Sequence, residues 1–266
     1  MDKQAVSSIF PDISLPEKGV YDIVFSLGCN CGCAEYLRKY GLRAAAGPFD
    51  WILAPSAQAP FRMLLEELRP LLQLEDLEAN SQSNAKTANR IVVSAQSGYT
   101  LFHDVWQDAP LEEQLPQVRA KYTRRAERFL NALRGKKRVL LVWYGETGLT
   151  LSDEEIVRFS GDVRKKYGQN TDFLFVQYEP GLTAALYKRL SDGAVKAALP
   201  PGEREEGNLL WDRRRVGPVF ASINCRCARQ PRWKGRLRAL AVRAASVFIW
   251  NRQKRHHFID IYLNGK

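Results

Sequence analysis

The sequence lacks any apolar run near the roughly 20 residues that a membrane-spanning helix needs. Residues 1–19 lack the apolar core of a signal peptide and carry acidic side chains, so we expect a cytoplasmic protein. The chain of 266 residues has three histidines, which leaves few candidates for a site built on imidazole. Its five cysteines are an odd number in two clusters, unlike the disulfide framework of a small secreted protein.

Two glycine-rich phosphate-binding motifs are also missing, G-x-G-x-x-G and G-x-x-x-x-G-K-[ST]. A phosphate site would therefore depend on the turn with Gly28 and Gly32, which follows the first expected strand and opens a helix. This position is right for phosphate, and it keeps a nucleotide or sugar-phosphate ligand as an alternative.

Positive charge is concentrated at the C-terminal end. The formal net charge is +11, and residues 201–266 contain 15 Lys and Arg against 5 Asp and Glu. We therefore expect an α/β domain over residues 1–200 and a basic C-terminal extension, residues 201–266, that packs on the same domain. Apolar side chains in 234–250 form one helical stripe, which indicates a surface helix or a basic amphipathic helix that meets an anionic glycan or a membrane surface. Nucleic acid is not an expected partner, because few aromatic side chains are interleaved with the basic ones.

Hydrophobic periodicity predicts the order of the elements. The expected strands span residues 20–28, 137–145, 172–181 and 257–265, with a hairpin over 90–105. The expected helices span 34–42, 60–74, 110–135 and 152–168, and the polar segment 75–90 is predicted to be a loop. The strand–helix–strand unit over 138–179 implies parallel pairing. We expect an α/β fold with a mostly parallel central sheet flanked by helices, in Rossmann-like layers, and a basic helical C-terminal extension.

The stretch "FSLGCNCGCAEYLRKYGL", residues 25–42, contains three alternating cysteines between a strand and a helix. Zinc sites usually use C-x(2–4)-C pairs, and no histidine is near this cluster or the Cys225–Cys227 pair, so we expect no metal. A thiol at a helix N-terminus has a stabilised thiolate, and Cys31 is the best placed of the three. The alternative is that these cysteines are small buried side chains.

A cysteine nucleophile needs a base. His103 lies in the patterned part of the chain beside Asp104, whereas His256 and His257 belong to the basic tail. A lone histidine is more often structural, but the order of cysteine and then histidine matches papain-type arrangements.

The segment "SLGCNCGCAEYLRKYGLR", followed by "GPFDWI" and later by "FHDV", resembles a bacterial family of unknown function described as "putative papain-like cysteine peptidases". The resemblance implies Cys31 as nucleophile and His103 as base. The motif does not give a third group. We prefer Asp50, which belongs to the P-F-D-W element, over Asp104, because neighbours on an extended chain point to opposite faces. Asn30 is expected to help hold an oxyanion.

We therefore expect a thiol-dependent hydrolase or acyl transferase that acts on a peptide or acyl substrate without a cofactor. One alternative is a nucleotide- or sugar-phosphate-binding transferase of surface-polysaccharide metabolism. Another is a non-catalytic protein that binds anionic glycans or membrane surfaces through its basic C-terminal segment. The sequence assigns no role to Cys29, Cys33, Cys225 or Cys227.

Overall fold

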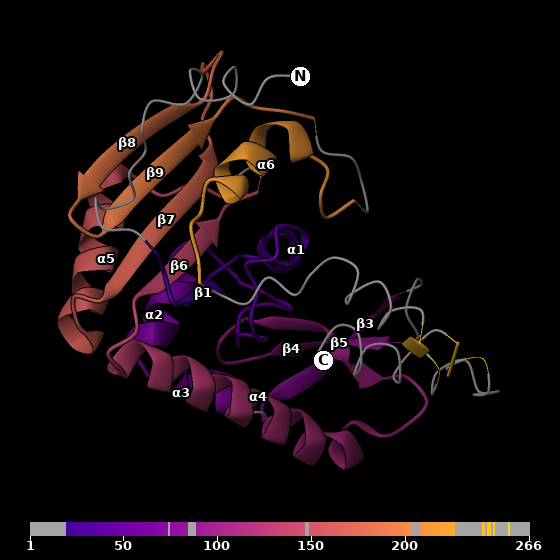
Figure 1. Ribbon diagram of the computed structural model, residues 1–266. Helices are drawn as coiled ribbons and strands as arrows, with labels where there is room; N and C mark the ends of the chain where they lie inside the picture. The colour runs from indigo at the N-terminus through magenta and orange to yellow at the C-terminus, as the bar shows by residue number, and fades with distance from the viewer. Residues whose placement is uncertain are drawn as a thin grey trace.

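The chain folds into two β-sheets with helices around them (Figure 1). The computed structural model describes residues 20–73, 75–84, 89–146, 149–203 and 208–226, and positions 241, 242, 244, 245, 247 and 255. The first sheet has the strand order β1-β6-β7-β9-β8, and the second has the order β2-β5-β4-β3. The strands of the first sheet are β1 (Ile23–Ser26), β6 (Val139–Tyr144), β7 (Thr171–Tyr178), β9 (Ala194–Leu199) and β8 (Leu186–Ser191).

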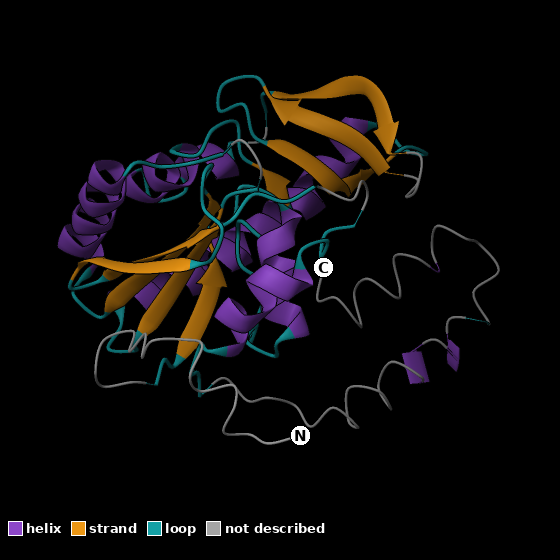
Figure 2. Ribbon diagram, turned by 90° about the horizontal axis from the view of Figure 1, so that it is seen from above, coloured by secondary structure: helices purple, strands orange, loops and turns teal. Residues whose placement is uncertain are grey.

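The first sheet confirms the expected fold class. Its strands β1, β6, β7 and β9 pair in parallel, and β8 joins the edge in the antiparallel direction. Helices cover both of its faces, with α1 (Cys31–Lys39) and α6 (Arg213–Ala221) on one side and α2 (Ala59–Leu65) and α5 (Asp153–Tyr167) on the other (Figures 1 and 2). Because both faces are covered, every residue of β6, β7 and β9 is buried, as is usual for parallel strands.

The expected βαβ unit is present as β6, α5 and β7. Helix α5 begins after Ser152, whose side chain accepts a hydrogen bond from the Glu155 backbone while Glu155 bonds back to the Ser152 N–H. This capping box satisfies donors at the start of the helix that would otherwise lack partners.

The second sheet is antiparallel and consists of β2 (Ile52–Leu53), β5 (Thr100–Trp106), β4 (Asn89–Ser94) and β3 (Leu77–Asn84). The prediction of a loop over 75–90 was wrong, because β3 occupies half of that segment and β4 begins at its end. Its polar composition gives no strand signal, and the pairing with β4 supplies the ladder that local sequence cannot show. The predicted hairpin over 90–105 is confirmed by β4 and β5.

The predicted continuous helix over 60–74 is divided in two. Helix α2 ends at Leu65, and the short α3 (Arg69–Leu72) follows. Between them Glu67 and Leu68 have φ angles of 56° and 63°, in the left-handed region that non-glycine residues seldom occupy. The fully buried Leu68 side chain and the 2.8 Å bond from its N–H to the Met63 carbonyl stabilise this corner.

The long helix α4 (Leu111–Arg134) joins the two sheets. Its Phe129 ring lies 4.8 Å from the ring of Phe25 on β1. Toward the second sheet, Tyr122 and Lys121 donate hydrogen bonds of 2.8 and 2.6 Å to the buried carboxylate of Asp104 on β5. The same helix therefore fixes β5 relative to β1.

Residues 208–226 of the basic segment lie against the first sheet. Asp212 caps α6 and accepts a 2.8 Å hydrogen bond from the Tyr178 hydroxyl of β7. Arg226 N–H bonds to the carbonyl of Tyr21 just before β1. The predicted strand over 257–265 and most of the predicted helix over 234–250 lie outside the described residues.

No helix among the described residues has both the length and the apolar character needed to cross a membrane.

Asp104→Asn should destabilise the protein in a pH-dependent way. Burial raises the pKa of Asp104, but Lys121, Arg125 and Tyr122 outweigh burial and lower it to about 2 from 3.8. Because the folded-state pKa lies below the unfolded one, this stabilisation is complete above about pH 4 and is lost as pH falls toward 2. We expect Asp104→Asn to lower the unfolding free energy by about 2 kcal/mol at pH 7, measured by urea denaturation.

The exposed Glu127 on the same helix is the control position, and Glu127→Gln should change stability little. The difference in unfolding free energy between the wild type and Asp104→Asn should shrink as the pH falls from 4 to 2. A difference that stays constant or grows would contradict a lowered pKa of Asp104.

Candidate active site

The turn from β1 to α1 positions Cys31. A Cβ atom at Gly28 would lie 2.8 Å from the Asn30 carbonyl and from the Cys33 Cβ, so this tight turn requires glycine. Asn30 is the N-cap of α1, and its Oδ1 accepts a 2.7 Å hydrogen bond from the Gly32 N–H. Cys31 is thus the first helical residue, three positions earlier than the helix start that periodicity predicted.

The structure brings Cys31 and His103 into contact, although they are 72 positions apart. Cys31 Sγ lies 3.8 Å from His103 Nε2, within hydrogen-bonding range for sulfur. Cys31 follows β1 of the first sheet, and His103 lies on β5 of the second sheet. The candidate site therefore lies where the two sheets meet. The catalytic roles assigned to these two residues stay predictions.

Trp51 and Arg43 support the imidazole from one side. The Trp51 ring meets the His103 ring edge-on, with centroids 5.9 Å apart and an angle of 87°. The Arg43 guanidinium lies 5.3 Å from the centre of the Trp51 ring. Arg43 Nε donates a 2.7 Å hydrogen bond to Asp50, which also accepts one of 2.9 Å from the Gly47 N–H.

Asp50 is 1% exposed, and both of these bonds go to its Oδ2. The contacts that the structure shows therefore link Asp50 to the imidazole through Arg43 and Trp51. A direct role for Asp50 in orienting His103 stays a prediction.

Asp104 points away from the site. Its carboxylate bonds to α4, whereas the neighbouring His103 faces Cys31. This is the alternation expected for adjacent residues on a strand.

Asn30 has one amide atom to offer a substrate. Its Oδ1 is used in the helix cap, and its Nδ2 has no hydrogen-bond partner within the described part of the chain. The side chain is partly exposed. A donor at this place fits the predicted help in holding an oxyanion, which stays a prediction.

The other two cysteines of the cluster are sealed in the core. Cys29 and Cys33 are each 0% exposed, whereas Cys31 is 7% exposed. Burial and the nearby Glu146 raise the pKa of Cys29 to about 12. Burial also raises the pKa of Cys33 well above its usual range, and its Sγ donates to the Val142 carbonyl. Both thiols are structural in this environment.

Sequence reasoning missed Glu146 and Tyr144, which lie close to the start of α1. A Cβ atom at Gly32 would lie 3.2 Å from Glu146 Oε1 and 3.4 Å from Tyr144 Cε1. Both residues are at the carboxyl end of β6, and Glu146 is 4% exposed. Strand β6 lies beside β1 in a parallel sheet. Ligands bind at the carboxyl ends of such strands, and this rule could have indicated that Tyr144 and Glu146 lie near the site.

Within the described part of the chain, no group of three or more His, Cys, Asp or Glu side chains could hold a metal ion. Cys225 is disulfide-bonded. Cys227, His256 and His257 lie outside the described residues.

Alkylation should distinguish the three cysteines. We expect iodoacetamide at about pH 8 to modify Cys31 in the native protein and to spare Cys29 and Cys33, because burial disfavours their thiolates. Peptide mass spectrometry measures the modified sites. In urea all three should react, which is the control for intrinsic reactivity. If Cys29 or Cys33 is modified in the native protein as fast as Cys31, the burial of these two thiols is contradicted.

Arg43→Gln should destabilise the protein, because it leaves the buried Asp50 carboxylate without its cation. The two side chains are 9% and 2% exposed, so we expect a loss of about 3 kcal/mol in urea denaturation. In the double variant Arg43→Gln/Asp50→Asn the loss should be smaller than the sum of the single losses. Arg43→Lys, which keeps the charge, is the control. If Arg43→Gln lowers the unfolding free energy by less than about 0.5 kcal/mol, the Arg43–Asp50 pair is not important for stability.

Comparison with protein families matches residues 22–176, more than half of the chain, to one family. A search of curated proteins and a search of solved structures each found no match. The matched region extends from the start of β1 to β7 and includes Cys31, Asp50 and His103. The chain therefore belongs to the family described as "Putative papain-like cysteine peptidase (DUF1796)".

Proposed function

We propose that the protein is a thiol-dependent hydrolase or acyl transferase. The observation that carries the proposal is the 3.8 Å distance between Cys31 Sγ and His103 Nε2 at the N-terminus of a helix. A nucleophilic cysteine needs a base within reach of its proton, and a helix N-terminus stabilises the thiolate.

In the proposed reaction, His103 removes the proton of Cys31, and the thiolate attacks the acyl carbon of a peptide or other acyl substrate. The carbonyl oxygen becomes an oxyanion, which Asn30 Nδ2 and N–H groups at the start of α1 stabilise. The imidazolium then protonates the leaving group, which departs and leaves a thioester. Water or another acceptor, deprotonated by His103, attacks the thioester carbon. The C–S bond breaks, the acyl group leaves on the acceptor, and the imidazolium returns its proton to the Cys31 thiolate.

Trp51, Arg43 and Asp50 act as positioning residues in this proposal. The edge-on Trp51 ring limits the rotation of the imidazole, and the Arg43–Asp50 ion pair holds Trp51.

The sequence-based alternatives are a nucleotide- or sugar-phosphate-binding transferase and a protein that binds anionic glycans or membranes through the basic segment. No contact in the structure favours either one, and much of residues 201–266 lies outside the described part of the chain. They stay predictions.

The proposal is tested with an activated acyl ester such as p-nitrophenyl acetate. Wild-type protein should show a burst of p-nitrophenol and an acetyl adduct on the peptide that contains Cys31. Cys31→Ala should abolish both, and His103→Ala should slow acylation by about 10²–10⁴-fold. The readouts are the burst amplitude and peptide mass spectrometry.

Cys29→Ala is the matched control, because it removes a buried thiol that is two positions before Cys31. It should keep the burst. Thermal unfolding shows whether each variant is folded. An acetyl adduct that persists elsewhere in folded Cys31→Ala, with an unchanged burst, would reject the proposal.

A further inference from the structure

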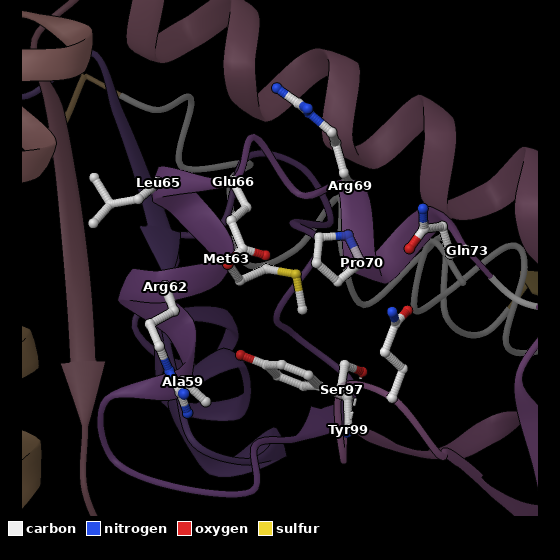
Figure 3. Close-up of a pocket in the computed structure, with 11 residues that line it drawn as sticks. Ala59, Arg62, Met63, Leu65, Glu66, Arg69, Pro70, Gln73, Ser97 and Tyr99 are labelled. Atoms are coloured by element: carbon white, nitrogen blue, oxygen red, sulfur yellow. Dashed lines mark hydrogen bonds between the residues drawn. The ribbon is translucent and has the colours of Figure 1, made fainter.

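A cavity lies between α2, α3 and the turn that joins β4 to β5 (Figure 3). Its volume is about 550 Å³, within the range of sites for small molecules. Ala59 and Met63 form an apolar part of its lining and are 4% and 3% exposed. The left-handed residues Glu67 and Leu68 form the corner between the two helices that line it.

A buried hydroxyl in this cavity lacks a partner. Tyr99 is 3% exposed, and its hydroxyl has no hydrogen-bond partner among the described residues. Figure 3 shows this hydroxyl directed toward the α2 side of the cavity, beneath Met63 and Glu66. Burial, and to a lesser extent Cys29, raises the pKa of Tyr99 well above its usual range. The hydroxyl is therefore neutral and can donate a hydrogen bond.

Two opposite charges line the same cavity as this hydroxyl. Arg62 and Glu66 are four positions apart, both line the cavity, and both act electrostatically on Tyr99. Arg62 is in the last turn of α2 and Glu66 is its C-cap, a spacing at which an ion pair can form. Neither residue forms an ion pair within the described part of the chain. Arg69 also lines the cavity, but its guanidinium extends away from Tyr99 in Figure 3.

We propose that this cavity binds a free α-amino acid with an apolar side chain. The guanidinium of Arg62 and the hydroxyl of Tyr99 bind its carboxylate, and Glu66 binds its ammonium group. The apolar side chain packs against Met63. An α-amino acid carries a carboxylate and an ammonium group on one carbon, which matches a cavity lined by a cation, an anion and a hydroxyl donor.

This site is separate from the Cys31–His103 pair. Tyr99 precedes His103 by four residues. In an extended chain this spacing places their Cα atoms about 13 Å apart. The inference therefore stands without the proposed function, and binding should be unchanged in Cys31→Ala.

Isothermal titration of the full chain tests the ligand class. L-Leucine and L-methionine should bind saturably at millimolar concentration and raise the melting temperature. N-acetyl-L-leucine lacks the ammonium group and L-leucinamide lacks the carboxylate, so each should bind at least about tenfold more weakly. If N-acetyl-L-leucine binds as well as leucine, or if no amino acid binds, the proposal is overturned.

Variants locate the site. Arg62→Gln and Glu66→Gln change exposed side chains and should each weaken leucine binding by about tenfold. Tyr99→Phe should weaken binding without lowering the melting temperature of the free protein, because it removes a hydroxyl that lacks a partner. Arg124→Gln, on the exposed face of α4, is the control and should bind leucine normally. Leucine binding that survives both Arg62→Gln and Glu66→Gln unchanged would overturn the assignment to this cavity.

Discussion

The packing of α4 between the two sheets is the constraint on which the candidate site depends. Phe129 packs against Phe25 of the first sheet, while the buried Asp104 carboxylate ties β5 to the same helix. Without this double attachment nothing in the local sequence would place His103 beside Cys31. Asp104 can stay charged while it ties β5 to α4, because the cations and the hydroxyl around it offset the cost of burying its carboxylate.

Three cysteines within five residues occupy three different environments. Each step along the turn and the first helical residues rotates the side chain by a large angle, so Cys29 and Cys33 face the two cores on either side of the first sheet. Cys31 faces the junction with the second sheet. The alternating spacing of the three cysteines thus separates a thiol at the site from two thiols in the core.

The P-F-D-W element has a physical role that its sequence does not reveal. Asp50 holds Arg43, Arg43 lies over Trp51, and Trp51 meets His103 edge-on. His103 lies on β5, whereas Tyr99 lies in the turn just before β5.

The sequence by itself determined the parallel βαβ core, the capped start of α5 and the hairpin β4–β5, because apolar periodicity and caps are local signals. The family motif singled out Cys31 and His103, which lie in contact, as candidates whose catalytic roles stay predictions. It did not determine β3, whose polar residues give no strand signal. Residues 186–199, for which no strand was predicted, carry a local hairpin signal, because Asp192 and Gly193 form a two-residue link between β8 and β9. Only the tertiary structure decided which cysteines are buried, what Asp50 binds, and that Glu146 lies near α1. These depend on contacts between segments far apart in the chain, which no local pattern encodes.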